Sequence, residues 1–272
     1  MSFHCLSRWV SCLFIVLLAG SNGFAAEAQP IAGDIAAAGH VRMQAQRLAK
    51  LYFQIGLKVN VSAAERQIDL AQRQVDVDFR RLETYARKPA FQRTLVRCDT
   101  AWLELRGLVR KPVSAAHLER AAQLAEELSI HAGKLAMQIE AEAETPVARL
   151  LDLSSRQNML AQRLARLYMQ LQSGEQARGL LVDLEQTRKE FAAGLNAIES
   201  AAEGSPASRD ALVLAKNQWV FLDTAVSQLR ASSFDAKAVQ HVASSSERIQ
   251  EMLAAVTAQY LQDYGVAPRQ VR

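Results

Sequence analysis

The chain contains few of the residues that break helices or cross-link a fold. Only 12 glycines and 6 prolines occur among 272 residues, and aromatic residues make up 6%. The glycines and prolines gather at a few places, so long stretches of sequence are left without interruption. Because such stretches carry apolar residues three and four positions apart, the sequence predicts an all-α fold.

Cysteine is also scarce. Two of the three cysteines, Cys5 and Cys12, lie in an N-terminal stretch that is typical of an export signal. Cleavage of this stretch would leave Cys98 alone, which excludes an intrachain disulfide in the mature chain. The fold must therefore be stabilised by burial, and a chain of this size can bury roughly 70–75% of its unfolded surface.

The first 25 residues have the three parts of a secretory signal. Arg8 ends a short basic start, an apolar run follows from Trp9 to Gly20, and small residues around Ala25 offer a cleavage site. A lipoprotein signal needs a cysteine at the position of Ser21, so a lipid anchor is disfavoured. We therefore expect a signal peptide over residues 1–25 and a periplasmic protein, with a retained N-terminal anchor as the alternative.

The charge balance is close to neutral. The chain has 32 Lys and Arg against 28 Asp and Glu, and the two signs are interspersed. This balance argues against nucleic acid as a partner. After the signal, no segment is apolar over the roughly 18 residues that a membrane span needs, so we expect no span in the mature chain.

Turn signals divide the chain into eight segments of helical periodicity, four before residue 145 and four after. The signals are Gly56–Ser62, Lys88–Pro89, Arg110–Pro112, Thr145–Pro146, Ser173–Gly174, Gly204–Pro206 and Ser232–Ser233. Ser62 with Glu65 fits a capping box, and Ser205 with Pro206 fits a hydroxyl cap before a first-turn proline. Helices joined by such short turns favour up-and-down packing.

An internal repeat sets the domain organisation. Residues 43–54, MQAQRLAKLYFQ, match residues 159–170, MLAQRLARLYMQ, at nine of twelve positions when shifted by 116. Trp102 and Trp219 correspond at a shift of 117. Shared Leu and Ala could come from amphipathicity alone, but shared Gln, Arg and Tyr indicate duplication. We expect two tandem four-helix bundles, residues 26–144 and 145–272, joined through an almost unbroken helix near Ala143 and Pro146, with the bundles either end to end or side by side.

The repeated phrase resembles a known family. Residues 39–49, GHVRMQAQRLA, and more loosely residues 155–165, SRQNMLAQRLA, resemble the opening helix of the type IV pili methyl-accepting chemotaxis transducer N-terminal domain family. That family includes the periplasmic sensing domain of nitrate/nitrite-responsive histidine kinases. The resemblance implies a four-helix sensor bundle that pairs with a second bundle and holds a small anion between the two first helices.

The resemblance also implies the ligand set. Arg42 corresponds to the family's anion-binding arginine, whereas Asn158 stands at the equivalent place in the second repeat. Gly39, Met43 and Ser155 complete the expected anion site. Met43 belongs to the Arg-Met pair of the motif, Gly39 leaves room for an ion, and Ser155 and Asn158 offer neutral donors if the two first helices pack together. A guanidinium suits a planar monoanion such as nitrate or nitrite.

Other motif residues have plainer explanations. Gln46, Arg47, Gln162 and Arg163 are shared by both repeats, and we expect them to make interhelical hydrogen bonds and ion pairs. Arg42 itself could be a rim arginine whose stem covers apolar neighbours.

The sequence carries no catalytic, metal or cofactor signature. The residues three before His40, His117, His131 and His241 are not Glu, so no bundle-type Glu-x-x-His ligand pair occurs. A haem-attachment motif and a glycine-rich phosphate loop are also missing. We therefore expect a non-enzyme without a cofactor.

Three functions remain open. The chain could be a periplasmic sensor of a small anion such as nitrate or nitrite that acts through a membrane or envelope protein. It could instead be a helical scaffold that docks on another envelope component. It could also bind a different small ligand in a bundle.

Overall fold

The computed structural model describes residues 22–143, 145–174, 178–229 and 234–266. These residues form eight α-helices and one short 3₁₀ helix, and no strand occurs among them. The helices are α1 (Asn22–Gly56), α2 (Val61–Leu82), η1 (Glu83–Arg87), α3 (Pro89–Leu108), α4 (Ala115–Glu140), α5 (Val147–Gln172), α6 (Arg178–Glu199), α7 (Pro206–Ser227) and α8 (Ala236–Val266). The all-α prediction is confirmed.

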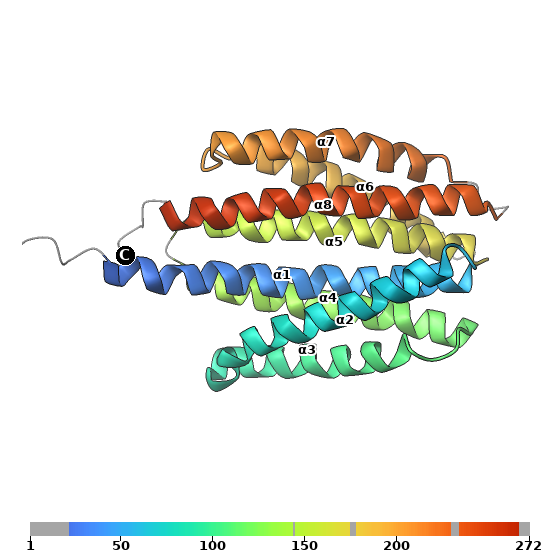
Figure 1. Cartoon of the computed structure of the whole chain (residues 1–272), viewed down its shortest axis with the longest axis horizontal. Coiled ribbons are helices and arrows are strands. Elements are labelled where there is room, and N and C mark those ends of the chain that lie inside the picture. Colours follow the sequence, from blue (N-terminus) through green and yellow to red (C-terminus); the bar gives the residue numbers. More distant parts are fainter. Residues whose placement is uncertain (1–21, 144, 175–177, 230–233, 267–272) are drawn as a thin grey trace, which may run out of the picture.

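The helices form two four-helix units that lie side by side (Figure 1). The first and fourth helices of each unit, α1 with α4 and α5 with α8, meet at the centre, while α2 and α3 lie on one outer side and α6 and α7 on the other. α1 and α5 run parallel to each other, and α4 and α8 run antiparallel to them. The central helices therefore bring the two repeated phrases together.

The repeat is visible in how the core packs. Trp102 of α3 stacks on Phe79 of α2 with ring centroids 6.3 Å apart, and Trp219 of α7 stacks on Phe191 of α6 at 4.3 Å. Each third helix thus packs onto its second helix through an equivalent tryptophan. Stacked aromatic pairs add to the burial of their own area and hold the two outer helices together.

Most expected boundaries lie where the structure has turns. The α2 start is wrong in detail, because α2 begins at Val61 after Asn60 in a left-handed conformation, and Ser62 makes no capping hydrogen bond. The expected cap at Ser205 is confirmed, since its side chain accepts a hydrogen bond from the Ser208 amide at 3.1 Å. Ser232 and Ser233 lie outside the described residues.

Of the two arrangements left open by the sequence, the units lie side by side, and the helix at their junction is interrupted. α4 ends at Glu140 and α5 begins at Val147, and the two helices are antiparallel neighbours instead of one continuous rod. At the N-terminus, residues 1–21 of the expected signal peptide lie outside the described residues, and α1 begins at Asn22, before the expected domain start at residue 26. The signal peptide stays a prediction.

The central helices α1 and α5 approach each other closely at Gly39. A Cβ atom placed on Gly39 would lie 2.4 Å from the Cβ of Ser155 and 2.6 Å from its Oγ. The Ser155 Cβ is fixed to its backbone, so it cannot move aside without moving α5. The missing side chain at Gly39 therefore lets the two units pack against each other.

We expect Gly39→Ala to lower the free energy of unfolding by about 1–3 kcal/mol, because the added methyl group forces α1 and α5 apart. Chemical denaturation monitored by circular dichroism measures this change. Gly107→Ala in α3 is the matched control, since a Cβ there meets no atom within 4 Å. The control should leave stability unchanged or raise it by up to about 1 kcal/mol. Equal effects of the two substitutions would contradict the close contact.

Candidate functional site

Two grooves flank the central α1–α5 pair. The α4 groove lies between this pair and α4 and has a cavity volume of about 370 Å³. The α8 groove lies between the pair and α8, with a volume of about 490 Å³. Both volumes are in the range of small-molecule sites.

The two grooves are lined by residues at equivalent positions of the two repeats. Arg42, Met159 and Asp152 line the α4 groove, and their counterparts at a shift of 116, which are Asn158, Met43 and Ala36, line the α8 groove. On the fourth helices the shift is 121, so Gly133 of α4 corresponds to Ala254 of α8. A comparison of the two grooves therefore shows how one site diverged after duplication.

Arg42 fills the α4 groove. Its side chain is 6% exposed, and its Nη2 donates to Asp152 Oδ1 at 2.9 Å and to the Asp152 carbonyl at 3.0 Å. The side chain crosses Gly133, where an added Cβ would lie 3.3 Å from the Arg42 Cδ and Nη1. Burial lowers the pKa of Arg42, and the charge of Asp152 opposes that shift. The guanidinium is thus buried at the contact between the two units and paired with a carboxylate of the other unit.

The structure divides the expected anion site between the two grooves. Gly39, Met43, Ser155 and Asn158 all line the α8 groove, whereas Arg42 lines the α4 groove on the other side of the α1–α5 pair. Arg42 therefore does not share a groove with the other four residues. The sequence could not foresee Asp152 as its partner, because the pair joins residues 110 positions apart.

Two clusters of ion pairs cross between the units, and some of their residues line the grooves. Arg47 and Lys50 of α1 both bind Glu247 of α8, with the Arg47 Nη2 2.6 Å from Glu247 Oε2. The equivalent Arg163 and Arg166 of α5 both bind Glu126 of α4, with the Arg163 Nε 2.8 Å from Glu126 Oε1.

These clusters follow the repeat. Glu126 and Glu247 correspond at the shift of 121, just as the cations correspond at 116. Lys50, Arg166 and the two glutamates were missed from the sequence, although the matching basic residues at positions 50 and 166 were a usable signal. Each cluster ties the first helix of one unit to the fourth helix of the other.

Gln46 and Gln162 link helices inside each unit. The Gln46 amide donates to the Ala125 carbonyl at 3.2 Å, and the Gln162 amide donates to the Ser246 carbonyl at 2.9 Å. Gln46 also accepts a hydrogen bond from Arg166 Nε at 2.7 Å. The shared polar residues of the repeated phrase therefore hold the first helices to the fourth helices.

The buried cations affect the titration of their partners. Burial lowers the pKa of Lys50, which is fully enclosed, and Glu247 opposes that shift. Burial alone would raise the pKa of Glu247, but the charges of Lys50 and Arg47 and their hydrogen bonds outweigh it and bring the pKa to about 2. Glu247 is therefore ionised at neutral pH and keeps Lys50 compensated.

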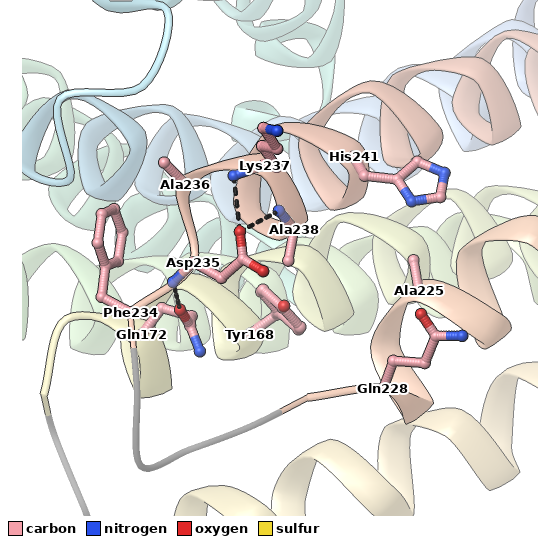
Figure 2. Close-up of a pocket in the computed structure, with 10 residues that line it drawn as sticks. All are labelled: Tyr168, Gln172, Ala225, Gln228, Phe234, Asp235, Ala236, Lys237, Ala238 and His241. Atoms are coloured by element: carbon pink, nitrogen blue, oxygen red, sulfur yellow. Dashed lines mark hydrogen bonds between the residues drawn. The ribbon is translucent and has the colours of Figure 1, made fainter.

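A third and larger cavity of about 990 Å³ lies at the end of the second unit, where α5 ends and α8 begins (Figure 2). The Asp235 carboxylate there accepts hydrogen bonds from the amides of Lys237 at 2.9 Å and Ala238 at 3.1 Å, and the Asp235 amide donates to Gln172 Oε1 at 2.9 Å. These groups cap α8 and join it to α5. Asp235 therefore has a structural role at the start of α8.

Groups with reactive chemistry are sparse in the described part of the chain. No set of three or more His, Cys, Asp or Glu that could hold a metal ion occurs there. Cys98 is buried, and burial raises the pKa of its thiol to about 12, so it stays protonated. None of the described helices is both long enough and apolar enough to cross a membrane.

The chain was compared with protein families, curated proteins and solved structures. No family model, no curated protein and no solved structure matches it.

We expect Glu247→Gln to lower the free energy of unfolding by about 3 kcal/mol, because it leaves Lys50 buried beside Arg47 without a carboxylate. Thermal and denaturant unfolding would measure the loss. Glu126→Gln is the matched variant in the second cluster. It should cost less, because the Glu126 side chain is 34% exposed against 22% for Glu247. A cost for Glu247→Gln no larger than that for Glu126→Gln would contradict the role of burial.

The lowered pKa of Glu247 predicts that the stability of the fold depends on pH. The pKa of Glu247 falls from its ordinary value of 4.5 when unfolded to about 2 when folded. The contribution of Glu247 to the free energy of unfolding is thus complete above pH 4.5 and is lost as the pH falls toward 2. Unfolding curves recorded across this range should show a smaller loss for Glu247→Gln than for the unchanged protein. An equal loss of stability with falling pH in Glu247→Gln and in the unchanged protein would contradict this prediction.

Proposed function

We propose that this chain is a non-enzymatic sensor that binds a small planar anion such as nitrate or nitrite beside Arg42. The observation that carries the proposal is a buried guanidinium at the contact between two duplicated units, held by one carboxylate in an open groove. As the N-terminal sequence suggests, the protein would be periplasmic, and it would pass its state to a membrane or envelope partner.

Asp152 marks the place that the anion would take. A carboxylate and nitrate both offer planar oxygens to a guanidinium, so the same donors that hold Asp152 can hold the free ion. Arg42 Nε is buried without a hydrogen-bond partner among the described residues. Arg156 also lines the groove, where it is paired with Glu190 at 3.2 Å.

The proposal includes a route from binding to signal. Asp152 belongs to α5 and Arg42 to α1, so their ion pair joins the two units. An anion that replaces Asp152 on Arg42 would break this link and leave the close contact at Gly39 as a pivot. Shifts of 1–2 Å between packed helices are a common way to transmit such a change.

A scaffold function has a separate observation in its favour. Val96 and Leu103 on α3 are 59% and 55% exposed, and their counterparts at a shift of 117, Val213 and Val220 on α7, are 53% and 60% exposed. The duplicated units thus present the same apolar positions on both outer sides. Exposed apolar residues of this kind suit docking to another envelope protein.

Calorimetry with nitrate, nitrite and chloride tests the sensor function. Asp152→Asn removes the internal competitor for Arg42 and keeps its shape, so we expect nitrate or nitrite to bind about tenfold more tightly than to the unchanged protein. Arg42→Ala combined with Asp152→Ala removes both charges and should abolish binding without leaving a buried unpaired charge.

The control is Asn158→Ala in the α8 groove, which should leave anion affinity unchanged. No binding of either oxyanion to the unchanged protein or to Asp152→Asn would overturn the anion site and favour the scaffold. Binding that persists in the double variant would place the anion away from Arg42.

A further inference from the structure

Four large apolar side chains are exposed on one side of α7, an outer helix of the second unit (Figure 1). They are Val213, Leu214, Val220 and Phe221, which are 53%, 57%, 60% and 58% exposed. They stand three and four positions before and after Asn217. At 3.6 residues per turn, all four lie within about 60° of Asn217 around the helix axis. Together with Asn217 they form one face, which we call the α7 patch.

The equivalent face of the first unit carries charge. At the shift of 117, Arg97 and Glu104 of α3 stand where α7 has Leu214 and Phe221. The Glu104 Oε2 lies 2.6 Å from the Nη2 of Arg120. The duplicated fold therefore accepts charged residues at these two places, so folding of the unit does not explain the apolar pair on α7. An exposed apolar face of this kind indicates an interaction surface.

The α7 patch is complementary to itself. Because its apolar residues are spaced symmetrically about Asn217, a twofold axis at Asn217 would place a second α7 antiparallel to the first. Val220 and Phe221 of one copy would then lie at the same level as Val213 and Leu214 of the other, and the same contact would form twice. The spacing thus favours a second copy of this chain over an unrelated protein.

The central asparagine suits the same pairing. A carboxamide has one acceptor and two N–H donors, so two Asn217 side chains that meet at the axis can donate to each other. A single asparagine within an apolar helix contact is also a common way to fix register.

The charges near the patch do not oppose the pairing. Lys216 is the one charged residue between Val213 and Phe221, and its Nζ lies 2.6 Å from Glu199 Oε2 of α6, so its charge is compensated. Asp210 and Thr224 lie seven positions before and after Asn217. In the antiparallel pair, each aspartate would therefore face a threonine instead of another carboxylate.

The size of the patch predicts a weak dimer. Half-exposed side chains of this kind leave on the order of 100 Å² each for a partner to cover. Two copies would thus bury on the order of 800 Å² of apolar surface, together with the polar residues around it. This area is at the low end for specific complexes, so we expect dissociation in the micromolar range.

From these observations we propose that two copies of this chain pair through α7, in an antiparallel dimer whose twofold axis passes Asn217. None of the described residues that line the α4 groove or the α8 groove belongs to α7. The dimer is therefore separate from the anion site proposed at Arg42.

Sedimentation velocity over a wide range of protein concentrations tests the dimer. We expect a monomer–dimer equilibrium with a dissociation constant of about 1–100 µM. Leu214→Glu with Phe221→Glu should give a monomer throughout, because four carboxylates would meet across the axis. Both side chains are more than half exposed, so the fold should be kept, which circular dichroism checks. The matched control is Val96→Glu with Leu103→Glu on α3, which should leave the dimer unchanged.

Cysteine cross-linking tests the position of the axis. In a background with Cys5→Ser and Cys12→Ser, Asn217→Cys should form a disulfide-linked dimer with oxidised glutathione, because the two thiols meet at the axis. Asp210→Cys should not, since its two copies would lie 14 residues apart along the helices, or about 21 Å. Cys98 is buried and does not compete.

Three results would overturn the proposal. They are a protein that stays monomeric up to about 300 µM, a dimer that survives the two glutamates on α7, and cross-linking at positions 210 and 217 alike, which would mean parallel helices. Nitrate affinity measured on the glutamate variant should equal that of the unchanged protein, so a failure of the dimer stays distinct from a failure of the anion site.

Discussion

The contact between the parallel helices α1 and α5 governs the rest of the structure. Gly39 allows the two backbones to approach at Ser155, and this approach brings the fourth helix of each unit within reach of the first helix of the other. Glu247 and Glu126 then pair with the buried cations of the opposite unit. Since desolvated ion pairs of this kind are costly to leave incomplete, they fix the relative position of the units.

Duplication gives the chain something that a symmetric dimer of identical units lacks, which is the freedom to change one copy of a site. The ion-pair clusters have the same charges in both copies, with Lys50 in one at the place of Arg166 in the other. The grooves have diverged instead, to Arg42 with Asp152 in one and to Asn158 with Ala36 in the other. The two grooves on either side of the same helix pair therefore differ in their lining residues.

The sequence predicted the helices well and the groove chemistry only in part. Proline, glycine and the 3.6-residue period define helix ends and buried faces locally, which is why Ser205 was recognised as a cap. Ser62 was not a cap, because Asn60 adopts a left-handed conformation that starts α2 earlier. The repeated phrase pointed to Arg42. Its partner Asp152 lies on α5, 110 positions further along the chain, and no local sequence pattern joins the two.

By itself, the sequence determined an all-helical chain, its duplication and the residues shared by the two repeats, because periodicity and self-similarity are properties of the chain alone. The tertiary structure decided which side of the α1–α5 pair each of those residues occupies. That choice depends on the rotation of α1 and α5 about their own axes, which is set by the packing at Gly39 and by the partners on α4 and α8. For this reason Arg42 and Asn158, at equivalent places in the sequence, line opposite grooves.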